Sequence, residues 1–425
     1  MTTDMDGKLA FTYRRALEAL RSGVPNREAV KILGCQQPQV EHQFATLLRQ
    51  CADQQNPPSS SLGMLVSGGF GAGKSHLLSY LEHQALSQGF VCSRVAVSKE
   101  TPLYDLGKVF KSAIDHGRIP ERSGQLMEEL GVGLHENSAA YARFLKWADA
   151  ERNGLHRIFP ATLVVHEKAS DPELIGDIRA FWSGGKIAIS TVKKGLKAVG
   201  QLQNYVFKAP KASDLPPQRL RFTTELIKGA GYQGWVVLLD EVELVGFYSR
   251  LQRARSYADL ARWLGKVSGE ACPGLVVVGT VTDDFAAAIL GVGGKQDRDY
   301  VGHWLRSRGE AAVAARAETG MRTLERETIQ LEPPTAEKVT TTVEKLRHIY
   351  SIAYAWEAPR VESMAGGAGH RSRMRYKVRA AINEWDLMRL YPNSRPETEG
   401  IDYRPGYHED PELTREGENE ADEAR

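Results

Sequence analysis

Residues 68–75 read Gly-Gly-Phe-Gly-Ala-Gly-Lys-Ser, a combination of residue types that suits phosphate binding. They fit the pattern G-x-x-x-x-G-K-[ST], and an apolar run precedes them while a helical pattern follows. Glycines let the backbone turn its N–H groups toward phosphate oxygens, and the helix N-terminus adds a positive dipole end. In such loops the lysine contacts the β- and γ-phosphates and the hydroxyl ligates Mg²⁺. The sequence therefore predicts an ATP site made by Gly68, Gly69, Phe70, Gly71, Ala72, Gly73, Lys74, Ser75 and His76, with Ser75 as a metal ligand.

A pair of acids closes a later apolar run. The run at residues 235–239, WVVLL, is followed by Asp240 and Glu241, and this hhhhDE pattern is the Walker B arrangement. In phosphate-loop NTPases the aspartate holds Mg²⁺, so Asp240 is the second predicted metal ligand. Glu241 is expected to orient and deprotonate the attacking water as a general base. Glu243 is a third acid nearby, for which a structural or partner-contact role is expected.

Threonines follow the next apolar run, residues 275–279. A hydroxyl at the end of that strand can hydrogen-bond the γ-phosphate or the attacking water. Thr280 is the better placed of the two, and Thr282 is the second choice. Bonding of the threonine to local backbone is an almost equally supported alternative.

Arginines can stabilise the charge that develops during phosphoryl transfer, and a neighbouring subunit can supply them. Arg322 and Arg326 precede the last predicted strand and are candidates for this role. Arg371 and Arg373 open a helical pattern after a glycine-rich stretch, and one of them is expected to enter the nucleotide cleft of its own chain. For each arginine alone, a surface role remains the better-supported alternative.

The elements that position these residues alternate between strand and helix. Apolar runs at 62–67 and 90–97 flank a helical pattern at 75–87, and this βαβ order predicts a parallel sheet. The continuously apolar runs 235–239 and 275–279 read as strands buried on both faces, and a last strand is expected near 328–331. The predicted fold is therefore an α/β phosphate-loop NTPase, a parallel sheet with flanking helices.

The chain divides into segments of different composition. Lys74 and Asp240 are 166 residues apart, more than a bare βαβαβ path needs, so a large helical insertion is expected between them. The prolines at 333 and 334 separate the last strand from a C-terminal helical lid. The predicted organisation is an N-terminal helical region at 1–53, an ATPase core at 62–332 with the insertion at about 112–220, the lid at 333–392, and an acidic disordered tail at 393–425.

Charge is distributed unevenly along the 425 residues. The net charge is +2, but residues 396–425 hold eleven acids against three arginines, a net charge of −8, so residues 1–395 carry +10. This basic body permits a nucleic-acid partner. The predicted insertion contains Lys186, Lys193, Lys194 and Lys197, for which DNA contact is one interpretation and a solvated helix face the better-supported one.

Several classes of protein are excluded by composition. No apolar run reaches 18 residues, so no membrane-spanning helix is expected, and the N-terminus lacks the pattern of a signal peptide. The four cysteines at 35, 51, 92 and 272 are too widely spaced for a zinc ribbon or a redox pair. Buried reduced thiols in a cytoplasmic protein are the expected reading.

The order of phosphate loop, hhhhDE, polar strand end and helical lid is similar to that of AAA+ ATPases, especially the Orc/Cdc6-like initiators. A narrower resemblance, to the BrxD family of ATP-binding proteins in bacterial BREX anti-phage systems, covers most of residues 10–392. It implies an ATPase that binds ATP and Mg²⁺ and works with DNA-modifying and DNA-surveilling partners. A winged-helix domain usually follows the lid in Orc-type initiators; an acidic tail stands here, which argues against autonomous sequence-specific DNA binding. The segments that carry the resemblance are RRALEALRSGVPNREAVKILG (14–34), SGGFGAGKSHLLSYLEHQAL (67–86), VAVSKETPLYD (95–105), VVLLDEVEL (236–244) and IQLEPPT (329–335).

Three functions are compatible with these features. The first is an ATPase whose hydrolysis drives assembly or conformational change in a DNA-associated defence complex, as a homo-oligomer or with other ATPase subunits. The second is a nucleotide-gated scaffold with little hydrolysis; Glu241 favours the first, because a scaffold needs no general base. The third, a small-molecule kinase, is weaker, because the sequence shows no short lid or acceptor pocket.

Overall fold

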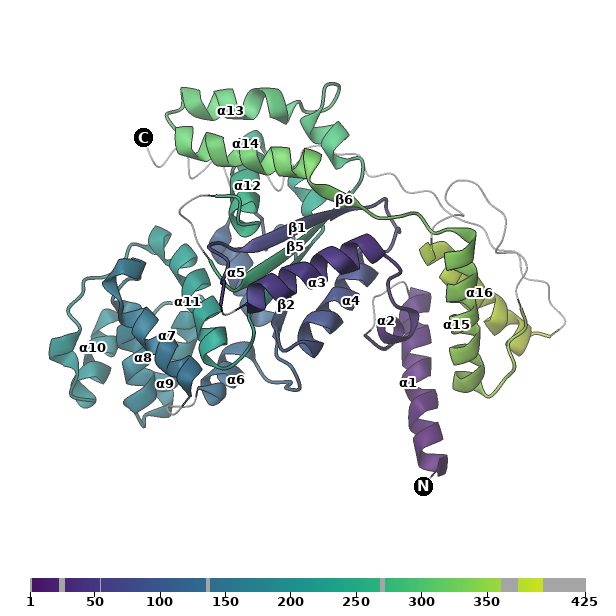
Figure 1. Ribbon diagram of the computed structural model, residues 1–425, viewed down its shortest axis with the longest axis horizontal. Coiled ribbons are helices and arrows are strands. Elements are labelled where there is room, and N and C mark those ends of the chain that lie inside the picture. Colours follow the sequence, from purple (N-terminus) through teal and green to yellow (C-terminus); the bar gives the residue numbers. More distant parts are fainter. Residues whose placement is uncertain are drawn as a thin grey trace.

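The computed structural model describes residues 2–22, 27–53, 55–134, 138–267, 272–360 and 374–392. Within them a six-stranded sheet lies at the centre of the molecule, in the order β3-β2-β4-β5-β1-β6 (Figure 1). Five strands run parallel, while the two-residue strand β3 pairs antiparallel with β2. The prediction of a parallel sheet is therefore wrong at this edge, where β3 interrupts a stretch expected to be helical. The strands are β1 (Leu62–Ser67), β2 (Val91–Ala96), β3 (Gly117–Arg118), β4 (Trp235–Asp240), β5 (Leu275–Val281) and β6 (Thr328–Gln330).

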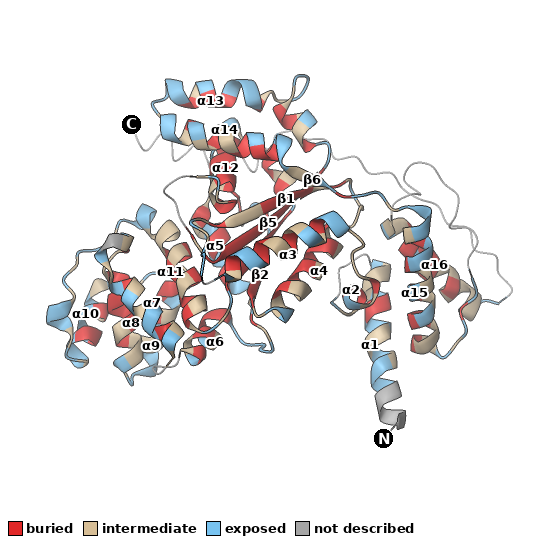
Figure 2. Ribbon diagram, viewed as in Figure 1, coloured by how far each residue is buried: buried red, intermediate tan, exposed pale blue. Residues whose placement is uncertain are grey.

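Helices cover both faces of this sheet, which is why β4 and β5 are buried along their whole length (Figure 2). Successive side chains of a strand point to opposite faces, so Val236 and Val237 enter different apolar clusters. On one face the cluster includes α3 (Pro38–Ala52) and α4 (Lys74–Ser87). On the other it includes α5 (Leu106–Asp115), α11 (Leu215–Gly229) and α12 (Arg250–Trp263).

The chain between β2 and β4 is helical apart from β3 and connecting turns, as the sequence predicts. Aromatic side chains form its centre: the Phe159 ring packs against Phe181 and Phe222 with centroids 5.4 and 5.1 Å apart. Trp182 donates its indole N–H to Thr162 at 3.0 Å inside the same core. Besides α5 and α11, the helices of this block are α6 (Leu126–Gly133), α7 (Ala139–Asp149), α8 (Ile158–Lys168), α9 (Pro172–Trp182) and α10 (Ile189–Ala198).

A second helical layer lies over the β5 side of the sheet, at the top of Figure 1. It consists of α13 (Asp297–Ser307) and α14 (Ala311–Arg326), which pack against α12 and against each other. Asp297 is buried at the start of α13 and accepts hydrogen bonds from both Arg253 Nε, at 2.6 Å, and Tyr257, at 2.7 Å. This satisfied buried ion pair fixes α13 against α12.

The two ends of the described chain pack together. Helices α1 (Thr2–Ser22) and α2 (Arg27–Leu33) share one apolar cluster with α15 (Ala336–Tyr354) and α16 (Met374–Leu390). Leu17 and Leu33 contribute to this cluster from one end, and Tyr350 and Trp385 from the other. Nothing in the sequence pattern predicts this pairing, because each helix shows only that it has an apolar face. The four helices form one unit beside the sheet, seen at the right of Figure 1.

The remaining sequence predictions concern cysteines, membranes and the acidic tail. All four thiols are free; Cys51, Cys92 and Cys272 are buried, whereas Cys35 is half-buried. None of the helices described combines the length and the apolar character that crossing a membrane requires. The tail predicted at 393–425 lies outside the described residues.

Candidate nucleotide site

The phosphate loop joins β1 to α4 in the conformation that its glycines permit. Gly71 and Gly73 have φ angles of +78° and +104°, a region that other residues rarely adopt. A Cβ built on Gly73 meets no atom within 4 Å, so open space borders the loop there. No side chain caps the N-terminus of α4, whose first N–H groups therefore remain available to an anion. The loop thus fits the phosphates of a nucleotide.

Lys74 is buried beside this loop, with 9% of its surface exposed. Its ammonium donates to the Gly68 carbonyl oxygen at 2.8 Å and lies 3.7 Å from Glu243 Oε1. Burial raises the pKa of the Glu243 carboxyl, and Lys74 opposes that rise. Glu243 Oε2 is buried without a hydrogen-bond partner. Glu243 and Lys74 both line the cavity, and the carboxylate and the ammonium lie next to each other there.

Asp240 accepts hydrogen bonds from side chains on three different elements, α4, β5 and β2. Its Oδ2 accepts from Ser75 Oγ at 3.1 Å and its Oδ1 from Thr280 Oγ1 at 2.8 Å. Because β5 lies between β1 and β4, Thr280 reaches Asp240 from the neighbouring strand. The predicted metal ligands, Ser75 and Asp240, are therefore adjacent. Their oxygens, together with phosphate oxygens and water, are the donor set that Mg²⁺ prefers.

Arg94, on β2, is the third side chain at Asp240 and was not predicted. Its Nη2 donates to Asp240 Oδ2 at 2.6 Å, and its Nη1 donates to Ser79 Oγ on α4 at 3.1 Å. The sequence holds one signal that could have identified it: a charged residue inside the run VCSRVAV, which is apolar apart from Ser93 and Arg94. A guanidinium placed there needs a carboxylate partner, and Asp240 on the adjacent strand supplies it.

Replacing Arg94 with Met should lower the free energy of unfolding, because the buried Asp240 carboxylate then loses a charged donor. Hydrogen bonds to charged groups contribute about 1.5–3 kcal/mol, and we expect a loss of that order in urea unfolding without nucleotide. Arg27→Met is the matched control: it removes a 3.2 Å contact to Glu82, which keeps Arg118 as a partner at 3.3 Å. The control should change stability by less than about 1 kcal/mol. Equal losses for the two variants would contradict the role assigned to Arg94.

Glu241 follows Asp240 in an unusual backbone conformation, with φ +61° and ψ +38°. A non-glycine residue in this left-handed region is uncommon and turns the chain sharply at the strand end. Its side chain is partly exposed to solvent and lines the same cavity as Lys74 and Ser75. Partial burial, followed by the negative charge of Asp240, raises the pKa of its carboxyl. A carboxylate with a raised pKa beside a phosphate-binding loop suits a general base.

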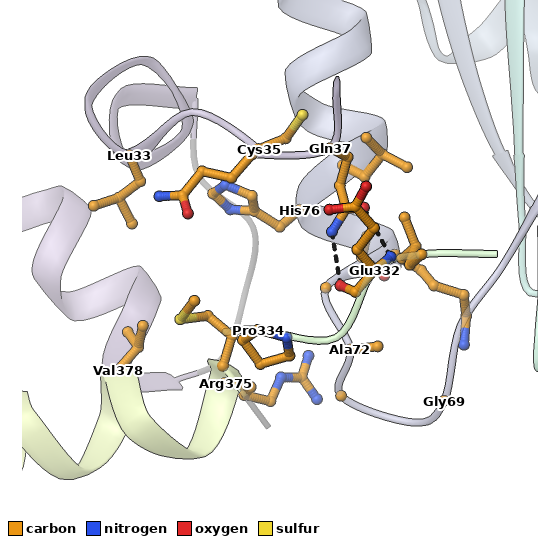
Figure 3. A pocket seen from close by; sticks show the side chains of 18 of the residues that line it. Leu33, Cys35, Gln37, Gly69, Ala72, His76, Glu332, Pro334, Arg375 and Val378 are labelled. Carbon is orange, nitrogen blue, oxygen red and sulfur yellow. Dashed lines mark hydrogen bonds between the residues drawn. The ribbon is translucent and has the colours of Figure 1, made fainter. Parts of the chain in front are cut away.

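These groups line one cavity of about 360 Å³, a size typical of small-molecule sites (Figure 3). Its wall comes from the phosphate loop, from residues 240–243, from the α2–α3 connection at 34–37, and from α15 and α16. His76, in the first turn of α4, contacts the α2–α3 connection, since its Nε2 lies 2.8 Å from the Gly34 carbonyl oxygen. Leu33, Met374 and Val378 supply apolar surface on the side away from Lys74, where a nucleotide base could pack.

The α2–α3 connection is hydrogen-bonded to the segment that leads into α15. Gln37 and Glu332 exchange two hydrogen bonds, at 2.9 and 3.1 Å, which Figure 3 draws as dashed lines. Lys338 Nζ donates to the Gln36 carbonyl oxygen at 2.9 Å, and Gln36 Nε2 donates to Thr342 at 3.1 Å. The cavity therefore lies between the sheet and the four-helix unit, and its wall depends on both.

Four other residues predicted for the site do not line the cavity. Thr280 and Thr282 are buried and absent from the cavity wall. Arg322 and Arg326 are exposed on α14 and do not line the cavity. Arg371 and Arg373 lie outside the described residues.

Arg375, two residues further along the same stretch, lines the cavity at the start of α16. Figure 3 shows its guanidinium extending between Pro334 and the phosphate loop. It is the described residue that best matches the arginine expected to enter the cleft from the same chain. The prediction for Arg371 and Arg373 themselves remains untested, because both lie outside the described residues.

A protein-family model described as "BREX system ATP-binding protein BrxC/D" matches residues 12–128 and 216–366. The two segments include the phosphate loop, Arg94, Asp240 and Thr280, and they leave out residues 129–215. No curated protein and no solved structure matches the chain.

Proposed function

The chain belongs to the BREX system ATP-binding protein BrxC/D family, and from this we propose that it is an AAA+-type ATPase of a DNA-associated anti-phage complex. Membership implies ATP binding and the presence of other subunits of a BREX system. Hydrolysis, Mg²⁺ dependence and self-assembly are the further parts of the proposal. The observation that carries it is the convergence of Lys74, Ser75, Asp240 and Glu241 on one cavity.

Each of these residues has a defined task in the proposed reaction. The loop N–H groups and Lys74 bind the phosphates. Ser75 and Asp240 hold Mg²⁺, which supplies charge neutralisation at the phosphates when bound. Thr280 fixes Asp240 through its 2.8 Å hydrogen bond and is therefore a positioning residue. Glu241 accepts the proton of the attacking water, and Arg375 adds positive charge from the lid side.

A nucleotide-gated scaffold remains the second candidate, and the Arg94–Asp240 pair is the observation that favours it. That ion pair occupies an oxygen of the predicted metal ligand at 2.6 Å. A site kept in this arrangement would bind nucleotide but hydrolyse little. Phosphate release from the purified protein, measured with ATP and Mg²⁺ and with and without DNA, separates the two. Turnover abolished by Glu241→Gln supports the ATPase, whereas no release under any condition supports the scaffold.

Lys74→Ala should weaken ATP binding, because it removes the ammonium that contacts the β- and γ-phosphates. Charge-assisted hydrogen bonds contribute about 1.5–3 kcal/mol each, so we expect a rise in Kd of at least about tenfold. Isothermal titration calorimetry of ATP against both proteins measures it. Lys338→Ala is the control, since Lys338 lies in the cavity wall but bonds Gln36 and Glu332. Equal ATP affinity for the parent and Lys74→Ala would reject the phosphate-loop assignment.

Self-association completes the proposal. Arg322 and Arg326 are exposed on α14 and do not line their own chain's cavity. Such arginines act on a nucleotide only if another subunit presents them. We therefore expect ATP-dependent association with a second copy or with another ATPase subunit of the defence system.

A further inference from the structure

Residues 183–213 contain six lysines and neither an acidic residue nor an arginine. With six bases and no acid, this segment is a local excess of positive charge. It begins after α9, includes α10 and ends before α11. The lysines are Lys186, Lys193, Lys194, Lys197, Lys208 and Lys211, and we call them the lysine surface.

Helix α10 presents three of these lysines on one face. Its buried residues are Val192, Gly195 and Leu196. A Cβ on Gly195 would lie 2.8 Å from Val165 Cγ1 on α8, so this face is in close contact with the block. The opposite face carries Lys193, Lys194 and Lys197, spaced one and three residues apart, all exposed.

No lysine of this surface has an ion-pair or hydrogen-bond partner for its ammonium among the described residues. All six are exposed. Some other surface lysines have partners, as Lys111 does with Asp115 at 2.8 Å. Six unneutralised positive charges within one short segment create a positive potential that attracts a polyanion.

The ATPase site does not use these charges. None of the six lysines lines the nucleotide cavity, and all lie between the two segments that the family model matches. Figure 1 places α10 at the outer edge of the helical block, on the opposite side of the molecule from α15 and α16. Their role is therefore not to bind the nucleotide in this cavity.

The side chains indicate which polyanion fits. Lysine is a point charge that contacts phosphate, while arginine, the commonest reader of guanine edges, is absent. Single strands need exposed aromatic rings for base stacking. Here the Tyr205 ring is covered by the Arg157 guanidinium, 5.1 Å from its centroid, and Phe207 packs against His156. Charge without stacking platforms or base-reading groups suits the backbone of a duplex.

We propose that the lysine surface binds the phosphate backbone of a nucleic-acid duplex without reading its sequence. This proposal rests on one part of the proposed function, the association of the protein with DNA. Binding through it needs no nucleotide, so it is measured without ATP and can fail or succeed independently of hydrolysis. The acidic stretch 396–425 of this chain is another polyanion that could compete for the lysine surface. A duplex carries one negative charge per about 1.7 Å, whereas a protein chain carries at most one per residue, which spans about 3.3–3.6 Å when extended. The duplex has the higher charge density and is therefore the better competitor for the lysines.

Fluorescence anisotropy with a labelled DNA duplex of arbitrary sequence tests the proposal on the full chain. Replacing Lys193, Lys194 and Lys197 by Gln should weaken binding on the order of 10- to 100-fold near 0.15 M salt and lower the slope of log K against log salt by about 2–3. The matched control, Lys8→Gln/Lys108→Gln/Arg255→Gln, removes three exposed positive charges elsewhere and should change binding by less than about threefold. Thermal unfolding verifies that both variants are folded.

Four results would overturn the proposal. The first three are the absence of duplex binding by the parent at low salt, an equal loss in the two variants, and displacement of the duplex by poly-glutamate at equal charge concentration. The third would mean that an acidic protein segment occupies the surface. Preference for a single strand over the duplex would likewise contradict it, whereas equal affinity for unrelated duplex sequences supports it.

Discussion

Glu241→Gln is expected to leave ATP bound and to lower turnover by ~10²-fold or more. Glutamine preserves the size of the side chain and part of its hydrogen bonding, but it cannot accept the proton of the attacking water. The backbone at Glu241 sits at φ +61°, and glutamine meets the same steric cost there as glutamate. Steady-state phosphate release and ATP binding by calorimetry, measured on the same preparation, separate the loss of chemistry from the loss of affinity.

The neighbouring acid supplies the comparison. Glu243→Gln alters a carboxyl that lies 3.7 Å from Lys74, so its main effect should be on ATP affinity. Turnover that survives in Glu241→Gln and disappears in Glu243→Gln would transfer the base role to Glu243. Neither outcome affects the assignment of the phosphate loop.

The pH dependence follows from the raised pKa of the Glu241 carboxyl. Only the ionised carboxylate accepts a proton, so turnover should fall as pH decreases through this pKa. Because burial and Asp240 raise it, the fall should begin at a higher pH than for an ordinary glutamate of pKa about 4.3. A pH profile of kcat, with protein folding verified at each pH, measures this.

Arg322→Ala/Arg326→Ala should abolish most of the activity if these exposed arginines complete a neighbouring subunit's site. An arginine finger contributes ~10³–10⁵ in rate in NTPases where it has been measured. The double variant should still bind ATP, because neither side chain lines its own cavity. Activity per protein should also rise with protein concentration in the parent and stay low in the variant. Lys8→Gln/Arg255→Gln, which removes two other exposed charges, is the control.

Mixing two inactive variants tests whether Arg322 and Arg326 act on the nucleotide site of a neighbouring subunit. Glu241→Gln retains the arginines, and Arg322→Ala/Arg326→Ala retains the base, so some interfaces of a mixed oligomer pair an intact base with intact arginines. Part of the activity should return on mixing. If mixed oligomers form, as checked by differently tagged chains, and no activity returns at any ratio, then the arginines do not act on a like subunit.

Much of the sheet could be predicted because its strands follow from local patterns of apolar residues in the sequence. The apolar run at 62–67 has the same bounds as β1. Strand β4 extends the predicted run 235–239 by one residue, and β5 extends the run 275–279 by two. Short, continuously apolar runs rich in Val and Leu and bounded by glycine and polar residues are typical of strands buried on both faces of a sheet. The antiparallel strand β3 was missed, since two residues carry no periodicity.

Within the site, the sequence by itself determined the phosphate loop, Asp240 and Glu241. Their residue types and spacing reflect chemistry that short segments must perform, and the strand that ends at Asp240 places it at the same sheet edge as the loop. Tertiary structure alone decided which side chains meet Asp240. Thr280 and Arg94 reach it because β5 and β2 flank β4, and strand order is a property of the whole sheet.

Tertiary structure also decided how the cavity closes. Helices α1 and α2 join α15 and α16 across more than 300 residues of sequence, with Gln36 bonding Thr342 at a separation of 306. An amphipathic helix shows in its sequence that one face must be buried, but any apolar face of matching shape can bury it. The choice among these partners is made by the packing of the complete chain. For that reason the part of the cavity wall formed by these helices, unlike the phosphate loop, could be identified only in the folded protein.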